Sequence, residues 1–180
     1  DFRSFAHDGS ASEESWLRYH HVVPTQQTWI AADRGLPLDQ DLTPQLVSDY
    51  CAYNAGTAKF QYDNRRRRGP IDGEDQKGVG LHWVGDLAVS CTLDVRSKQG
   101  EVVFELVEGG RRMQCRVDVA TGRAALSIVG DEFHREANTA VSRPGTYELM
   151  FANIDDELLL WVNGKVVAFD EATAYDPLGN

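Results

Sequence analysis

The chain has 180 residues, of which 42% are hydrophobic and 26% are charged. That length suits one domain with a substantial core, and the composition is that of a globular protein. With 18 basic and 28 acidic residues the formal net charge is −10, so phosphates are repelled and we expect no binding to nucleic acid or to an anionic membrane surface. The longest notable apolar run, residues 158–162, is far shorter than the roughly 20 residues that cross a bilayer, which predicts no membrane segment in this chain.

The first half of the chain gives irregular signals. It begins at Asp1 without an initiator methionine, as a processed protein or a piece of a longer one would. Residues 20–30 predict one or two strands around Pro24, and residues 45–53 predict another. Residues 59–78 are polar and include four arginines, Arg65 to Arg68, which predicts a mobile loop. Because strands from both ends of a chain commonly pair in jelly rolls, we expect a single domain over residues 1–180.

The second half shows a clear alternation of apolar and polar residues. A period of two is typical of strands that bury one face. The pattern predicts strands over residues 87–95, 101–108, 113–119, 124–128, 147–151, 158–162 and 165–169. Short turns separate them, including Gly109-Gly110, residues 153–156 and the hairpin signal Asn163-Gly164. Short strands joined by such turns predict an all-β antiparallel sandwich or barrel.

The three cysteines, Cys51, Cys91 and Cys115, are widely spaced and form no Cys-x-x-Cys pair. That spacing argues against a zinc site and against a disulfide framework. Cys91 and Cys115 fall on the apolar phase of their strands, so we expect buried free thiols. One disulfide remains open as an alternative.

No catalytic constellation is recognisable. Glycoside hydrolysis needs two carboxylates about 5–9.5 Å apart, whereas Glu101 and Glu105 on one strand face lie roughly 13 Å apart. The sequence contains no Glu-x-Asp-x-x-Glu motif and no Gly-x-Ser-x-Gly elbow. All four lysines fall in turns or in the polar loop, where none is a buried base for a Ser/Lys dyad. We expect no catalytic residue and no cofactor in this chain.

Metal and ligand candidates are few. The histidines are scattered, and Asp155, Asp156 and Glu157 are weak calcium candidates beside the plainer interpretation of a solvated turn. Trp83 and Trp161 are the candidates for stacking on a sugar or another ligand. Trp161 has the opposite phase to its strand's inward residues, but Leu159 shares that phase, which favours a covered face and a core or inter-sheet role for Trp161.

Residues 81–169 resemble concanavalin A-like, laminin-G-like jelly-roll domains, and residues 157–167 (ELLLWVNGKVV) look like their closing hairpin. A narrower resemblance is to the extra domain of planctomycete proteins of the signal peptidase I-like (S26) family. It rests on residues 46–54 (LVSDYCAYN), 82–87 (HWVGDL), 110–115 (GRRMQC), 118–122 (DVATG) and 151–156 (FANIDD). That resemblance implies a membrane-anchored parent with an exported catalytic part that uses a Ser/Lys dyad. The family's Gly-Asp-Asn-x-x-x-Ser signature is absent here, so no catalytic residue is carried over.

The sequence therefore favours a non-catalytic interaction or accessory domain, on the exported or periplasmic face of a membrane-anchored parent. Its partner would be a glycan, a protein or the rest of its own parent chain. The alternatives are a carbohydrate-binding module and a glycan-active hydrolase with an unrecognised site. The ligand, the oligomeric state and the role of Arg65 to Arg68 do not follow from the sequence.

Overall fold

The computed structural model describes most of the second half of the chain and parts of the first. The described residues are 4–9, 14–19, 21, 26–37, 48–51 and 79–177, without the side chains of 48–51 and 79–83. Contacts divide the chain into two compact units, residues 1–14 with 85–180, and residues 15–84. The single domain expected over residues 1–180 stays a prediction, and the polar run 59–78, with Arg65 to Arg68, lies outside the described residues.

The smaller unit contains a helix where the sequence predicted strand. Helix α1 spans Gln26–Asp33, so the strand prediction is wrong over that part of residues 20–30. Gly35 supplies the stop signal, because its φ of 62° is a left-handed value that glycine adopts freely. The N–H groups of Gly35 and Leu36 then bond back to the carbonyls of Ala32 and Ala31, at 3.1 and 2.9 Å, which is a glycine-capped helix end.

A two-stranded sheet completes the described part of this unit. Strand β1 (Ser48–Cys51) falls within the strand predicted over residues 45–53, and it pairs antiparallel with β2 (Val79–Trp83). The side chains of Cys51 and Trp83 lie outside the described residues. Over the described ranges of the whole chain, no helix combines the length and the apolar character that a membrane crossing needs.

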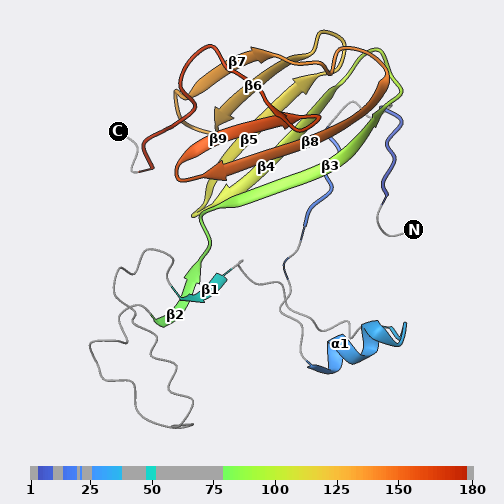
Figure 1. Ribbon diagram of the computed structural model, residues 1–180, viewed down its shortest axis with the longest axis vertical. Helices are drawn as coiled ribbons and strands as arrows, with labels where there is room; N and C mark the ends of the chain where they lie inside the picture. Colours follow the sequence, from blue (N-terminus) through green and yellow to red (C-terminus); the bar gives the residue numbers. More distant parts are fainter. Residues whose placement is uncertain are drawn as a thin grey trace. The chain divides into compact units, whose positions relative to one another are not determined.

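The larger unit is an antiparallel β-sandwich (Figure 1). Its strands are β3 (Leu87–Val95), β4 (Glu101–Glu108), β5 (Arg111–Asp118), β6 (Arg123–Ile128), β7 (His134–Asn138), β8 (Gly145–Ile154), β9 (Glu157–Val162) and β10 (Lys165–Val166). One four-stranded sheet has the order β10-β9-β8-β3, and the other has the order β4-β5-β6-β7. The all-β sandwich predicted from the sequence is confirmed.

The turns between strands form where the sequence carries Gly, Asn and Asp. Asn163 and Gly164 have φ values of 52° and 73°, and positive φ at both central residues defines the predicted type I′ turn. Asp155 and Asp156 also have positive φ, 49° and 61°. The turn between β8 and β9 is therefore narrower than the predicted residues 153–156, and Asn153 belongs to the strand.

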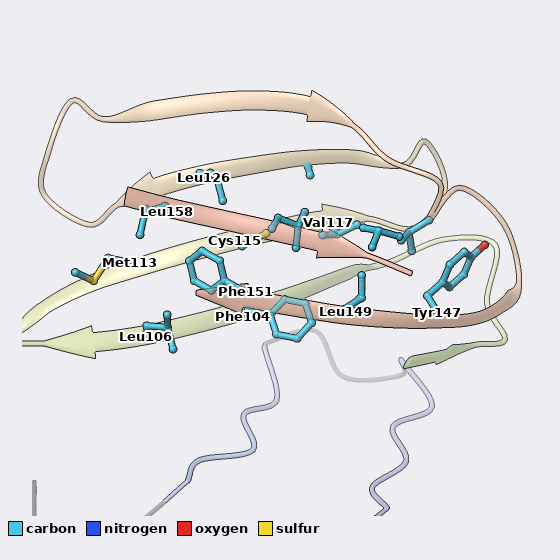
Figure 2. Close-up of a cluster of buried hydrophobic side chains, with 14 of the residues drawn as sticks. Phe104, Leu106, Met113, Cys115, Val117, Leu126, Tyr147, Leu149, Phe151 and Leu158 are labelled. Atoms are coloured by element: carbon cyan, nitrogen blue, oxygen red, sulfur yellow. The ribbon is translucent and has the colours of Figure 1, made fainter. Parts of the chain in front are cut away.

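The core lies between the two sheets and is built from their inward-facing residues (Figure 2). Its largest fully buried side chains are Phe151, Met113, Leu126, Leu149, Leu158, Leu160, Val117, Val141 and Cys115. Burying an aliphatic or aromatic side chain of this size stabilises a fold by about 1.5–3 kcal/mol. At one edge of the core the Tyr147 hydroxyl donates a hydrogen bond to the carbonyl of Arg143, at 2.8 Å, so this buried ring keeps its polar atom satisfied.

Strand β7 lies between the strands predicted over residues 124–128 and 147–151, where the sequence predicted no strand. Its residues are polar because it is an edge strand, and Arg135 stands on its inward phase opposite Leu126. The Arg135 guanidinium lies over the Phe133 ring, 4.5 Å from its centroid. Its Nε also donates to the carbonyl of Ala172, at 2.6 Å. The arginine thus covers the open side of the core without burying an unpaired charge.

The C-terminal segment, residues 167–177, closes this side of the sandwich. It bonds to β9 through Val167 N–H to the Leu160 carbonyl, at 2.8 Å, and through Leu158 N–H to the Thr173 carbonyl, at 3.1 Å. Between these points Asp170 N–H bonds to the Glu136 carbonyl of β7, at 3.0 Å. The segment therefore links β9 of one sheet to the edge strand β7 of the other.

The opposite side, where β3 forms the edge of its sheet, is less covered. Leu87, Val89 and Leu93 point to the core side but are only partly buried. Cys115 is fully buried as predicted, whereas Cys91 is an exposed free thiol. The prediction of a buried Cys91 is wrong because only β8 flanks β3 among the described strands, so an inward phase there does not guarantee cover.

Candidate functional site

A cluster of polar side chains gathers at one end of the sandwich. This end cluster consists of Asp86, Glu108, Arg111, Asn153, Asp156 and Tyr175. Asn153, at the end of β8, is only 2% exposed. Its Nδ2 donates to Glu108 Oε2, at 2.8 Å, and to the Gly85 carbonyl, at 3.4 Å. Its Oδ1 accepts a hydrogen bond from the Tyr175 hydroxyl, at 3.0 Å. The buried amide is therefore satisfied at both ends, as buried polar groups must be.

Arg111 fastens the C-terminal segment to this end of the sandwich. Its guanidinium lies over the Tyr175 ring, 5.2 Å from the centroid. Its Nη1 donates to the carbonyls of Asp176 and Pro177, at 3.2 and 2.7 Å, and its Nη2 bonds to Asp131, at 3.1 Å. A planar guanidinium with five donors suits this role, because one side chain can serve several acceptors at once.

Glu108 holds its proton more tightly than an ordinary glutamate. Partial burial raises the pKa of its carboxyl most, and the negative charges of Asp156 and Asp86 raise it further. The hydrogen bond from Asn153 and the charge of Arg111 oppose that rise. Partial burial and the charge of Glu108 also raise the pKa of the Tyr175 hydroxyl. Such a carboxyl could donate a proton, but its contacts with Asn153 tie it to the fold.

Sequence reasoning missed the end cluster. Its members come from positions 86, 108, 111, 153, 156 and 175, so no local spacing reveals them. The one available signal was Asn153 itself, a polar residue on the inward phase of a strand that otherwise buries Phe151 and Leu149.

The calcium candidates are not brought together as ligands. Asp155 and Asp156 occupy the turn between β8 and β9, where the Asp155 N–H donates to Asp86 Oδ1, at 3.0 Å. Glu157 accepts a hydrogen bond from the Thr173 hydroxyl, at 2.9 Å. Throughout the described part of the chain, no group of three or more His, Cys, Asp and Glu side chains could hold a metal ion.

The outward surface of the β10-β9-β8-β3 sheet carries apolar side chains. Trp161 pairs across the sheet with Met150 on one side and with Val166 on the other, and Leu159 pairs with Ala152. These five residues are called the outer apolar face. Trp161, Leu159 and Met150 are half-buried and stand apart from the core between the sheets, Ala152 is fully buried, and Val166 is 58% exposed. Trp161 therefore lies outside the core, contrary to the core role that the sequence favoured, although the buried Ala152 agrees with its prediction that this face is partly covered.

The outward surface of the other sheet is charged and internally bonded. Arg116 binds Glu101 at 2.7 Å and Glu14 at 2.8 Å. Gln114 donates to Glu105 at 2.6 Å and is 8% exposed, although it faces outward. Glu101 and Glu105, the carboxylates considered for glycoside hydrolysis, are thus both engaged on this surface.

The chain has three further tryptophans. The structure does not describe the side chain of Trp83, the second stacking candidate. Trp16 and Trp29 are exposed, at 45% and 61%. Comparison with protein-family models, with curated proteins and with solved structures finds no match to this chain.

Proposed function

We propose that the chain is a non-catalytic interaction domain that binds an apolar protein segment through the outer apolar face. The observation that carries this proposal is Trp161, a large aromatic residue on the surface of the sheet instead of in the core. Tryptophan is enriched among the residues that dominate binding energy at protein interfaces. Contiguous apolar surface on an otherwise polar protein is typical of interaction sites.

The contrast between the two outward surfaces supports this proposal. On one sheet the outward side chains neutralise one another, as Arg116 does with Glu101 and Glu14. On the other sheet the central rows, Met150 with Trp161 and Ala152 with Leu159, contain no charge. An uncharged patch loses little hydration when it is covered, so this is the surface that gains from a partner.

The charges around the outer apolar face favour a particular chemistry of partner. Glu148 borders the face next to Met150, and Glu157 borders it next to Leu159, on the same outward phase of β8 and β9. The whole chain carries a net charge of −10. A segment with an apolar centre and Lys or Arg on both sides would match this arrangement. The resemblance to the S26-family extra domain supports a partner segment within the domain's own exported, membrane-anchored parent protein.

The experiment is a selection of peptides from a displayed library against the full chain. Enriched peptides should have apolar centres with basic flanks, and Trp161→Ala should weaken their Kd about tenfold or more, as loss of a central anchor does. Val166→Ser should weaken binding less. Val107→Ser is the matched control, because Val107 is similarly exposed, at 54% against 58%, but lies on the other sheet. Binding that is indifferent to Trp161→Ala would overturn the proposal.

A carbohydrate-binding module is the second candidate, because a surface tryptophan is also a stacking platform for sugar rings. Its test is a thermal-shift screen against soluble glycans, with and without calcium, since a ligand that binds only the folded state raises the melting temperature. A shift that disappears in Trp161→Ala would replace the protein partner with a glycan. The nearest cross-strand neighbours of Trp161 are Met150 and Val166, which offer no hydrogen bonds to sugar hydroxyls and so favour the protein partner.

A further inference from the structure

Strand β3 has one occupied edge and one edge without a partner among the described strands. All nine of its residues pair with β8, from Leu87 opposite Asn153 to Val95 opposite Gly145. In its sheet β3 comes last, after β10, β9 and β8. Every second residue of β3 therefore directs its backbone N–H and C=O groups away from β8, where they can form hydrogen bonds with another strand.

This edge lacks the features with which proteins usually prevent strand addition. Those features are prolines, lysines, bulges, short length or an inward charge. Strand β3 has nine residues in continuous register, no proline and no lysine, and its one charge is Asp94, near the end and on the outward phase. The apolar residues Leu87, Val89 and Leu93 are only partly buried. A further strand would cover them.

We infer that β3 pairs antiparallel with β3 of a second copy of this chain, with the two Cys91 residues opposite each other at the centre. The pairing would join two four-stranded sheets across one edge. It does not depend on the proposed function, because the pairing uses the free backbone edge of β3 and not the side chains of the outer apolar face, although β3 lies next to that face.

The sequence of β3 is self-complementary in this register. Pairing about Cys91 sets Val89 opposite Leu93 of the second copy and Leu87 opposite Val95, so apolar residues meet on the inward face. On the outward face Ser90 meets Thr92, and the charge of Asp94 meets Ala88. The register therefore sets no like charges opposite each other, which cross-strand pairs avoid.

Charges just outside the strand select the same register. Pairing about Cys91 brings Arg96 opposite Asp86 of the second copy, once at each end of the shared edge. Arg96 now binds Asp94 at 2.8 Å and is 86% exposed, so its guanidinium is accessible to a second carboxylate. A register centred on the next inward residue, Leu93 or Val89, loses this opposition and shortens the paired edge.

Cys91 is a built-in reporter of the pairing. Opposite residues in antiparallel strands have Cα atoms about 4.5–5.5 Å apart, which lies within the range of about 4.4–6.8 Å that a disulfide spans. Partial burial raises the pKa of the Cys91 thiol, so the cross-link is tested at alkaline pH with diamide as oxidant. The azo group of diamide takes two electrons and two protons and becomes a hydrazine, while two thiols become one disulfide.

The test combines sedimentation with cross-linking of the full chain in a Cys51→Ser background. Cys115 is fully buried and does not compete. We expect a reversible dimer by sedimentation and a covalent dimer after treatment with diamide. Cys91→Ser should abolish the covalent dimer. Val89→Lys should prevent both forms, since lysine on the inward phase blocks an edge. Ala88→Lys is the matched control: it lies one residue away on the outward phase, meets Asp94, and should leave the dimer intact.

A charge exchange guards against variants that merely unfold. Arg96→Asp alone and Asp86→Arg alone should each raise the dimer Kd several-fold, whereas the double variant should restore it. A chain that stays monomeric at 100 µM would overturn the inference, whether the edge is empty or covered by another segment of the same chain. A dimer that ignores Val89→Lys and the charge exchange would overturn it as well.

Discussion

Asn153 shows how one residue can organise an end of a sandwich. A fully buried amide that lost its partners would cost about 1–3 kcal/mol, so its surroundings have to supply them. Glu108 accepts from its Nδ2 and Tyr175 donates to its Oδ1. These two contacts join β4, β8 and the C-terminal segment. The same contacts hold the carboxyl of Glu108 close to Asp156 and Asp86, whose charges oppose its ionisation.

Glu108→Gln should make the protein more stable at neutral pH. The folded-state pKa of Glu108 lies above its unfolded value, which means that the fold favours the protonated carboxyl. The stabilisation from this group is complete below the unfolded pKa and is lost as pH rises through the folded pKa. A glutamine cannot ionise, and its carbonyl can still accept the hydrogen bond from Asn153. The melting temperature of the variant should exceed that of the parent at pH 7, and the difference should vanish near pH 4, close to the ordinary glutamate pKa of about 4.3.

Glu136→Gln is the control with the opposite sign. The hydrogen bonds from Arg123 and His134 lower the pKa of Glu136. Its contribution is present above the unfolded pKa and is lost as pH falls through the folded value. This variant should be less stable than the parent at pH 7. Equal responses of the two variants to pH would contradict the raised pKa of the Glu108 carboxyl.

At the scale of elements, alternation predicted most strands because each of them hides one face. Strands β3, β4, β8 and β9 lie where the pattern placed them, and the Asn163-Gly164 turn has the predicted positive φ values. Strand β7 was missed because its edge position permits a polar sequence. Helix α1 was missed because its eight residues, none of them buried, carry no amphipathic pattern.

Gly122 tests the packing between a turn and its neighbour. Gly122 has φ 78°, and an added Cβ would lie 2.7 Å from the carbonyl oxygen of Thr139. Gly130 has a similar φ of 86°, with nothing near the added atom. Both alanine substitutions pay about 1–2 kcal/mol for the left-handed conformation, but Gly122→Ala must also displace backbone. Urea unfolding should show a larger loss for Gly122→Ala than for Gly130→Ala, and equal losses would contradict the contact.

At the scale of the whole molecule, the sequence predicted a sandwich but not its open surfaces. Trp161 was correctly placed opposite in phase to Leu160, yet Leu159 on the same phase suggested cover. Local alternation distinguishes two faces without saying what lies on each. The end cluster was out of reach for a related reason, because residues 86, 108, 153 and 175 meet only after the sheets pack and the C-terminal segment closes one side.

The measurement that tests this account most directly compares the unfolding free energies of Trp161→Ala and Leu160→Ala. These neighbours lie on opposite faces of β9, where Leu160 is fully buried and Trp161 is half-buried outside the core. Leu160→Ala should cost about 2–5 kcal/mol. Trp161→Ala should cost about 1 kcal/mol, the value of partial apolar contact, while it removes binding of the selected peptides. If Trp161→Ala lowers the free energy of unfolding as much as Leu160→Ala does, Trp161 contributes to stability as a core residue does. That result would contradict the proposed binding surface.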